Sequence, residues 1–301
     1  MTTNGRTSAG WIHDLSDGGQ PPETGDPRRH ILYGAIAYLL AVLLLVGLSF
    51  VQLLLGLWGL VITELALAAF ALLACLIRRI DLASAFPIMK PRKGEPIAAL
   101  MLWIGTFLWV SVAATLQMLL FPQTAAVGEA VGEAITSSGV LFISLLVGAL
   151  LPGICEEMLF RGFFYRAFST LPKRKYAVPV VGILFGAFHL SLYRFLPTAL
   201  LGILLTYLIY RTGNLLLPVA VHTLNNAFSV LVTSLPVGAA ETAATAEAIA
   251  AGYTLTGELM LSMLFCAVLG TLLLYRGVRR LDRAAMGWPK RRVRPEDEIV
   301  M

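Results

Sequence analysis

The stretch from Val140 to Phe168, VLFISLLVGALLPGICEEMLFRGFFYRAF, decides the fold of this chain. It is longer than the roughly 20 mainly apolar residues that an α-helix needs to cross a bilayer. Its middle nevertheless carries two adjacent carboxylates, Glu156 and Glu157, followed by Arg161. A charged group at the centre of a spanning helix costs roughly 2.5–3.5 kcal/mol on insertion. The stretch is therefore predicted to cross a membrane and to carry a function there.

The rest of the sequence has the composition of a membrane bundle. Of its 301 residues, 57% are hydrophobic and 14% are charged, whereas soluble proteins carry about 25% charged residues. We therefore predict an all-α membrane protein with about eight transmembrane helices between residues 31 and 276. A disordered polar tail is predicted over 1–30 and a charged tail over 277–301. The predicted spans are Ile31–Leu55, Trp58–Ile77, Pro96–Phe121, Val140–Phe168, Ala177–Leu192, Phe195–Tyr210, Asn214–Leu235 and Gly257–Tyr275.

The basic residues predict the orientation of the bundle. With eight spans, 22 of the 23 Lys and Arg residues fall on one side, including Arg161, and Arg194 falls on the other. Because basic residues concentrate on the cytoplasmic side, both termini are predicted to be cytoplasmic, with the protein in the plasma (inner) membrane. The net charge of +5 comes from clusters that flank apolar blocks. This distribution argues against a nucleic-acid partner.

The carboxylates inside the spans are Glu64, Glu156 and Glu157. Glu157 and Arg161 are four residues apart, so they share a helix face and are predicted to form an ion pair. Glu156 points about 100° away from Glu157 and has no such partner in the sequence. It is therefore the candidate general base, facing a cavity. A purely structural Glu–Arg pair between packed helices is the competing interpretation for Glu157 and Arg161.

Two histidines also lie in apolar helices. His189 shares a helix face with Phe185, and His222 shares one with Asn226. At ~1.5 Å per residue, Glu156, His189 and His222 lie about 18, 21 and 16 Å from the predicted cytoplasmic ends of their helices. At these similar depths, a Glu–His pair is able to activate water while a His–Asn pair stabilises an oxyanion.

The same three side chains, Glu156, His189 and His222, are also a candidate Zn²⁺ site with a position left for water. The chain has no HExxH sequence, which excludes the helix-borne two-histidine zinc site, and no GxSxG nucleophile motif. From the residues alone, metal-dependent and metal-free hydrolysis both stay open.

Three motifs in this order resemble those of the CPBP (ABI) family of intramembrane proteases, which includes the CAAX prenyl endopeptidases and bacteriocin-processing proteins. Glu156-Glu157 with Arg161 is similar to the family's EExxxR motif. Phe185 with His189 is similar to FxxxH, and His222 with Asn226 to an HxxxN-type motif. The resemblance covers about residues 140–235.

This resemblance implies eight spanning helices around a cavity that opens to the cytosol. It also implies that Glu156 and His189 activate water while His222 and Asn226 face the oxyanion, with Glu157, Arg161 and Phe185 in support. A metal-independent glutamate mechanism is the expected one, with no cofactor required, and a divalent metal such as Zn²⁺ is the alternative.

We therefore expect an intramembrane endopeptidase whose partners are the lipid bilayer and a hydrophobic or lipidated peptide substrate. A non-proteolytic membrane scaffold or bacteriocin-immunity protein on the same fold is the second hypothesis. A transporter with a proton path through Glu64, Glu156 and the histidines is the third. The sequence shows no internal repeat, which argues against the transporter.

Overall fold

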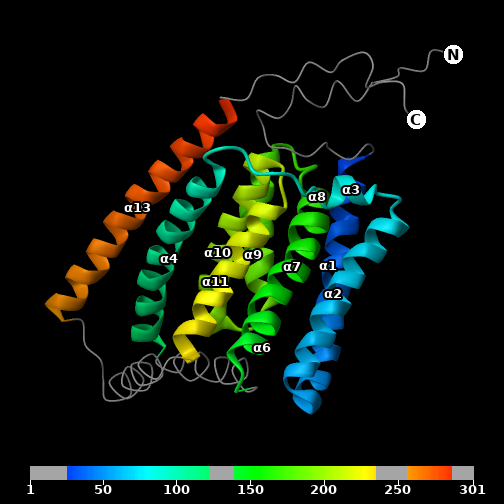
Figure 1. Ribbon diagram of the computed structural model, residues 1–301. Coiled ribbons are helices and arrows are strands. Elements are labelled where there is room, and N and C mark those ends of the chain that lie inside the picture. Colours follow the sequence, from blue (N-terminus) through cyan, green and yellow to red (C-terminus); the bar gives the residue numbers. More distant parts are fainter. Residues whose placement is uncertain (1–25, 122–138, 235–255, 287–301) are drawn as a thin grey trace.

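The computed structural model describes residues 26–121, 139–234 and 256–286 (Figure 1). Every regular element in these ranges is a helix, which confirms the predicted all-α class. The α-helices are α1 (Pro27–Leu55), α2 (Leu57–Ile77), α3 (Leu82–Ala85), α4 (Glu95–Leu120), α6 (Leu141–Leu145), α7 (Leu151–Glu157), α8 (Tyr165–Phe168), α9 (Ala177–Phe188), α10 (Leu192–Thr212), α11 (Leu216–Ser234) and α13 (Gly257–Met286). Two π-helical segments, Leu146–Leu150 and Met158–Phe164, join α6, α7 and α8 into one rod, and a 3₁₀ turn, Arg174–Tyr176, precedes α9.

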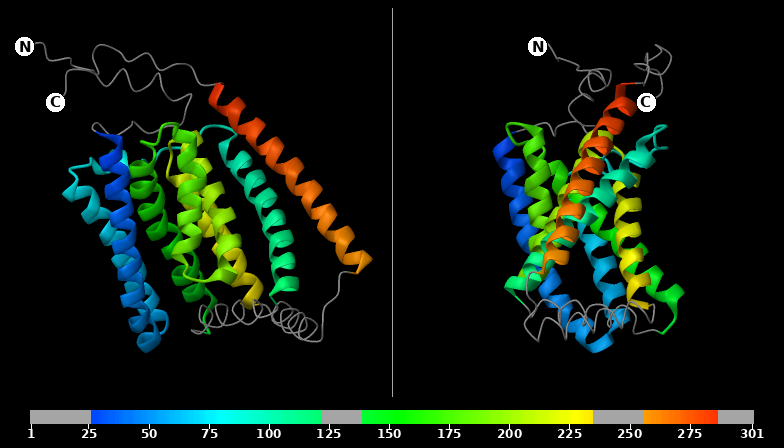
Figure 2. Two further views of the ribbon diagram at one scale, coloured as in Figure 1. Left: turned by 180° about the vertical axis from the view of Figure 1, so that it is seen from behind. Right: turned by 90° about the vertical axis from the view of Figure 1, so that its left-hand side faces the viewer.

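Seven helices in the described ranges are long and apolar enough to cross a membrane, and they match seven of the eight predicted spans. The eighth, α9, has 12 residues, so it rises only about 18 Å. It still packs against α10 as an antiparallel neighbour, and α1 begins at the same end of the bundle at which α13 ends (Figures 1 and 2). The predicted bundle is thus confirmed, with one short member.

The helix ends differ from the predicted ones. Asp26 caps α1 by accepting a hydrogen bond from the backbone N–H of Arg28 at 3.0 Å, so α1 begins at Pro27 and includes His30. At the other end, α13 continues to Met286. The inner parts of the predicted tails 1–30 and 277–301 are therefore helical, and residues 1–25 and 287–301 lie outside the described ones.

Helix α10 also begins earlier than predicted, at Leu192, despite Pro197 within it. Proline has no N–H, so the carbonyl of Tyr193 loses its normal helical donor. The side-chain amide of Gln117 on α4 donates to that carbonyl at 2.6 Å. An interhelical hydrogen bond thus replaces the missing one.

The centre of the bundle is formed by the rod that ends in α8 together with α9, α10 and α11, with α1 and α2 on one side and α4 and α13 on the other (Figure 2). An aromatic cluster fills the core between α1, the rod and α9: the Phe160 ring lies 5.4, 5.0 and 5.2 Å from the rings of Phe164, Phe185 and Phe188. Many large apolar side chains of α1 and α13 are exposed. They form the surface that faces lipid.

The rod from Leu141 to Phe168 departs from regular α-helix next to the motif residues. Pro152 offers no N–H to the carbonyl of Gly148, four residues before it. Gly148 lies within the π-helical turn Leu146–Leu150, which ends just before Pro152. Gly153 follows, and a Cβ there would meet the backbone N of Thr223 at 3.0 Å and its Cα at 3.2 Å. Without a side chain at residue 153, α7 and α11 approach closely enough for the polar groups on the two helices to meet.

Candidate active site

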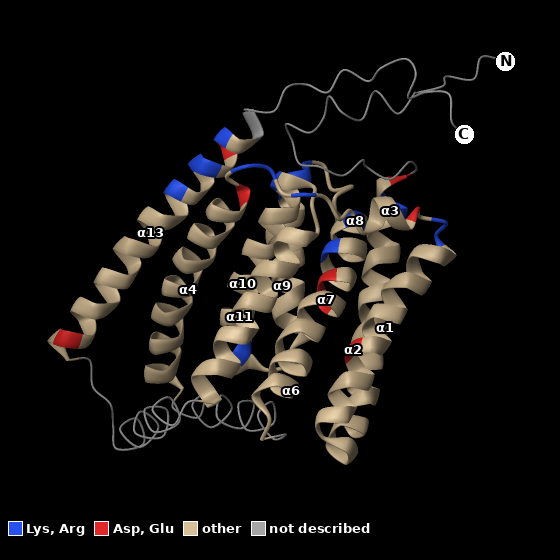
Figure 3. Cartoon of the chain, viewed as in Figure 1, with Lys and Arg blue, Asp and Glu red and all other residues tan. Residues whose placement is uncertain are grey.

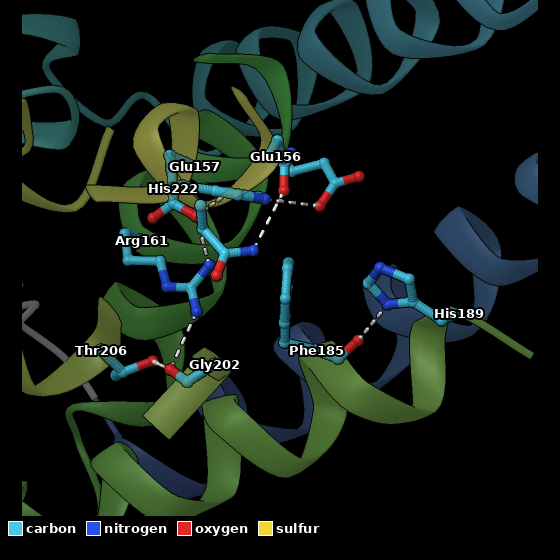
Figure 4. A network of polar contacts seen from close by, with 10 residues as sticks. Glu156, Glu157, Arg161, Phe185, His189, Gly202, Thr206 and His222 are labelled. Atoms are coloured by element: carbon cyan, nitrogen blue, oxygen red, sulfur yellow. Dashed lines mark hydrogen bonds and ion pairs between the residues drawn. The ribbon is translucent and has the colours of Figure 1, made fainter. Parts of the chain in front are cut away.

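Glu157 is the centre of a buried polar network (Figure 4). One of its carboxylate oxygens, Oε1, accepts from Arg161 Nη1 at 2.6 Å and lies 2.8 Å from His222 Nδ1. The side chains of Glu157 and Arg161 are fully buried, and that of His222 is 4% exposed. The predicted ion pair is confirmed, and the structure adds His222 as its third member.

Arg161 makes further contacts besides its ion pair with Glu157. Its Nη2 donates to the carbonyl of Gly202 on α10 at 2.9 Å, and Thr206 donates to the same carbonyl at 2.7 Å. The guanidinium also lies 4.6 Å from the centre of the Phe185 ring, a cation–π distance. The charge count that assigned Arg161 to the cytoplasmic surface is therefore wrong for this residue. Arg161 lies inside the bundle because a buried carboxylate and a carbonyl stabilise its charge there.

Glu156 differs from Glu157 in its exposure and in its hydrogen bonding. Its side chain is 14% exposed, and its Oε2 lies 3.9 Å from His222 Nε2. That oxygen is buried and has no hydrogen-bond partner within the described residues. The two adjacent carboxylates thus reach opposite nitrogens of one imidazole ring, which agrees with the predicted angle between them. One of them is neutralised, and the other is available for chemistry.

His189 follows the last residue of α9. Its Nδ1 lies 2.9 Å from the carbonyl of Phe185, the residue predicted to share its face. A carbonyl only accepts hydrogen bonds, so Nδ1 is the donor and Nε2 carries the lone pair of the neutral ring. The Phe185 ring stands edge-on to His189 at 5.0 Å and to His222 at 5.6 Å. Phe185 therefore contacts both histidines.

Asn226 lies one helical turn after His222 and accepts a 3.4 Å hydrogen bond from Asn225. Asn225 in turn accepts from the indole N–H of Trp103 on α4 at 3.3 Å. Within the described residues no direct hydrogen bond joins Asn226 or His189 to Glu156. The structure therefore brings Glu156, Glu157, Arg161 and His222 into direct contact, whereas Phe185 links His189 to them.

Sequence reasoning missed several members of this site. The Gly202 carbonyl and Thr206 give no sequence signal, because any residue supplies a carbonyl and threonine is common in helices. Asn225 stands next to Asn226 in the sequence, so the pair of amides was a visible sign. Glu64 on α2, by contrast, was identified in the sequence as an intramembrane carboxylate; it is only 4% exposed, and its carboxyl interacts electrostatically with that of Glu156.

The described residues do not fit the alternative metal site. Among them no group of three or more His, Cys, Asp and Glu side chains is gathered as metal ligands. The Phe185 ring contacts the rings of both candidate histidine ligands, at 5.0 Å for His189 and 5.6 Å for His222. We derive no chemical step through a metal.

The helical membrane bundle thus holds two adjacent carboxylates beside one imidazole, of which one is bonded to Arg161 and the other is placed to act on water. Residues 138–228 match the family model described as type II CAAX prenyl endopeptidase Rce1-like. This match includes all three motifs and bears out the predicted resemblance to the CPBP/CAAX intramembrane proteases. No curated protein and no solved structure matches the chain.

Proposed function

We propose that this protein is an intramembrane endopeptidase in which Glu156 and His189 activate a water molecule. His222 and Asn226 face the oxyanion that forms at the attacked carbonyl. The observation that carries the proposal is the difference between the two carboxylates. Glu157 is fully buried and its Oε1 is bonded to both Arg161 and His222, whereas Glu156 is 14% exposed and its nearest charged partner is His222 Nε2, at 3.9 Å.

The proposed reaction begins when Glu156 takes a proton from water, with the Nε2 lone pair of His189 as a second acceptor for the same water. The resulting hydroxide attacks the peptide carbonyl and forms a tetrahedral oxyanion. When the C–N bond breaks, the proton held by Glu156 passes to the departing amine. Glu156 ends as the carboxylate with which it began, so it is a base first and an acid second.

The buried ion pair has a supporting role in this mechanism. Glu157 accepts from His222 Nδ1 and fixes the ring, so that Nε2 is directed to the side of Glu156. When the ring carries a proton on Nε2 as well, that nitrogen donates to an oxyanion. Arg161 holds Glu157 in place. The amide of Asn226 is the proposed second donor.

The proposed substrate is a hydrophobic or lipidated peptide that reaches the site from the bilayer. The site lies within long apolar helices, and the matched family model is named for CAAX prenyl endopeptidases. We propose further that the protein lies in the plasma (inner) membrane with both termini in the cytoplasm. In Figure 3, most Lys and Arg residues of the described chain gather at the end where α1 begins and α13 ends, as expected for a cytoplasmic face.

The decisive experiment is substrate capture with the Glu156→Gln variant, followed by cleavage of the captured peptides by the unmodified protein. Glutamine keeps the size of the side chain and removes the base, so cleavage should fall by at least about 100-fold, the lower range for general-base catalysis. Glu95→Gln is the matched control, because Glu95 is also a buried carboxylate (3% exposed) but lies near Arg92 at the start of α4. It should leave cleavage unchanged.

Two outcomes would contradict the proposal. Full activity of Glu156→Gln would remove the assigned base. No cleavage by the unmodified protein, together with a biological function that survives alanine at His189 and His222, would favour the scaffold or immunity protein.

A further inference from the structure

Four arginines lie close together near the end of α13: Arg276, Arg279, Arg280 and Arg283. At 100° per residue their side chains fall within an arc of about 100° on one helix face. All four are exposed, and within the described part of the chain none of them has an ion pair. Figure 3 shows basic residues at this end of α13.

The acidic residue of α13 that lies nearest in sequence does not neutralise this arginine face. Asp282 points to another side of α13 and pairs with Arg211 of α10. Like charges three or four residues apart on a helix repel each other. An anion bound to the arginine face would remove this repulsion.

The arginines line a hollow. It has a volume of about 340 Å³, and its other lining residues are Tyr275 and, from α4, Met101. The Arg279 guanidinium lies 5.0 Å from the centre of the Tyr275 ring. A guanidinium presents N–H donors in a planar fork that matches the oxygens of a phosphate group. The chemistry of the hollow therefore suits a phosphate, with an apolar side for what is attached to it.

The arginine face continues into an apolar one. Leu261, Phe265, Val268 and Leu272 are 68, 66, 52 and 50% exposed. Their spacing places them on nearly the same side of α13 as the arginines, one to four turns further from the end of the helix. The opposite side of α13 packs on α4, where Gly270 and Gly277 are in close contact with its residues. The outer face of α13 is thus apolar along the bilayer and strongly basic at one end.

We propose that this face binds an anionic phospholipid, with its phosphate in the arginine hollow and its acyl chains along the apolar residues. Free phosphate would use only the hollow, and a soluble acidic peptide would leave the apolar residues uncovered. A phospholipid covers both. This binding site is separate from the proposed active site and does not depend on the proposed protease function.

The test uses the full chain reconstituted in phosphatidylcholine vesicles that contain a trace of spin-labelled phosphatidylglycerol or phosphatidylcholine. Electron paramagnetic resonance measures the fraction of each label that the protein immobilises. We expect the unmodified protein to prefer phosphatidylglycerol by at least about fivefold, because each basic residue near a membrane surface contributes to anionic-lipid binding. The R276Q/R279Q/R280Q/R283Q variant should lose most of this preference.

The matched control removes the same charge elsewhere, from four exposed lysines in K90Q/K93Q/K173Q/K175Q. It should keep the preference. If both variants lose the phosphatidylglycerol preference equally, general surface charge explains the binding and the proposed site is wrong. If the arginine variant keeps the full preference, the arginines do not bind the lipid and the proposed site is also wrong. If the quadruple arginine variant does not fold, the single variants Arg276→Gln and Arg283→Gln should each lower the preference. Displacement of the labelled lipid by inorganic phosphate at constant ionic strength would show a phosphate site and contradict the lipid.

Discussion

Replacing Arg161 by glutamine should destabilise the protein far more than breaking an exposed ion pair of the same chemistry. Arg161 and Glu157 have no exposed side-chain surface, and Arg161 also donates to the Gly202 carbonyl. The variant leaves the Glu157 carboxylate buried with only His222 as its partner. The loss of one member of a buried pair costs about 3–5 kcal/mol, because the remaining charge is left uncompensated.

The structure supplies the control for this prediction. Arg211 and Asp282 also form an arginine–carboxylate pair, but their side chains are 27 and 38% exposed. Arg211→Gln should therefore cost only about 0–1 kcal/mol. Removing both charges of the buried pair, in E157Q/R161Q, should cost less than the two single variants added together, because neither charge is then left alone.

The free energy of unfolding is measured in mixed micelles by raising the fraction of sodium dodecyl sulfate until the helical signal changes. The expected order of destabilisation is Arg161→Gln, then E157Q/R161Q, then Arg211→Gln. If Arg161→Gln costs no more than Arg211→Gln, the buried pair contributes little to stability, and the reasoning from burial is wrong.

The close contact of α7 with α11 predicts that Gly153→Ala costs roughly 1–3 kcal/mol of unfolding free energy, since the added methyl group meets the Thr223 backbone. Gly47→Ala, where the space is open, should be neutral or slightly stabilising in the same micelle titration. His189→Gln should lower the rate of peptide cleavage by about 100-fold or more while leaving thermal unfolding nearly unchanged, and equal activity would remove this residue from the mechanism. Because side chains carry every proposed proton transfer, treatment with a metal chelator should leave the cleavage rate intact; a rate that falls and returns on adding Zn²⁺ would require a metal instead.

The sequence by itself determined the class of protein and much of the architecture. Runs of about 20 apolar residues predict spanning helices, because a helix in lipid must satisfy its own backbone hydrogen bonds. The same local regularity predicts the Glu157–Arg161 pair, whose members are one turn apart. The three motifs also predicted the family, since a motif is read directly along the chain.

Contacts between helices were decided only by the tertiary structure. His222 meets Glu157 across 65 residues of sequence, and helical periodicity carries no information over that separation. Helical periodicity also does not predict that the Gly202 carbonyl accepts a hydrogen bond from Arg161. The charge count also placed Arg161 on the cytoplasmic side, because a count of charges cannot recognise a buried partner. The packing of α7 on α11 adds His222 to the Glu157–Arg161 pair of the opening stretch, and the packing of the rod on α10 adds the Gly202 carbonyl.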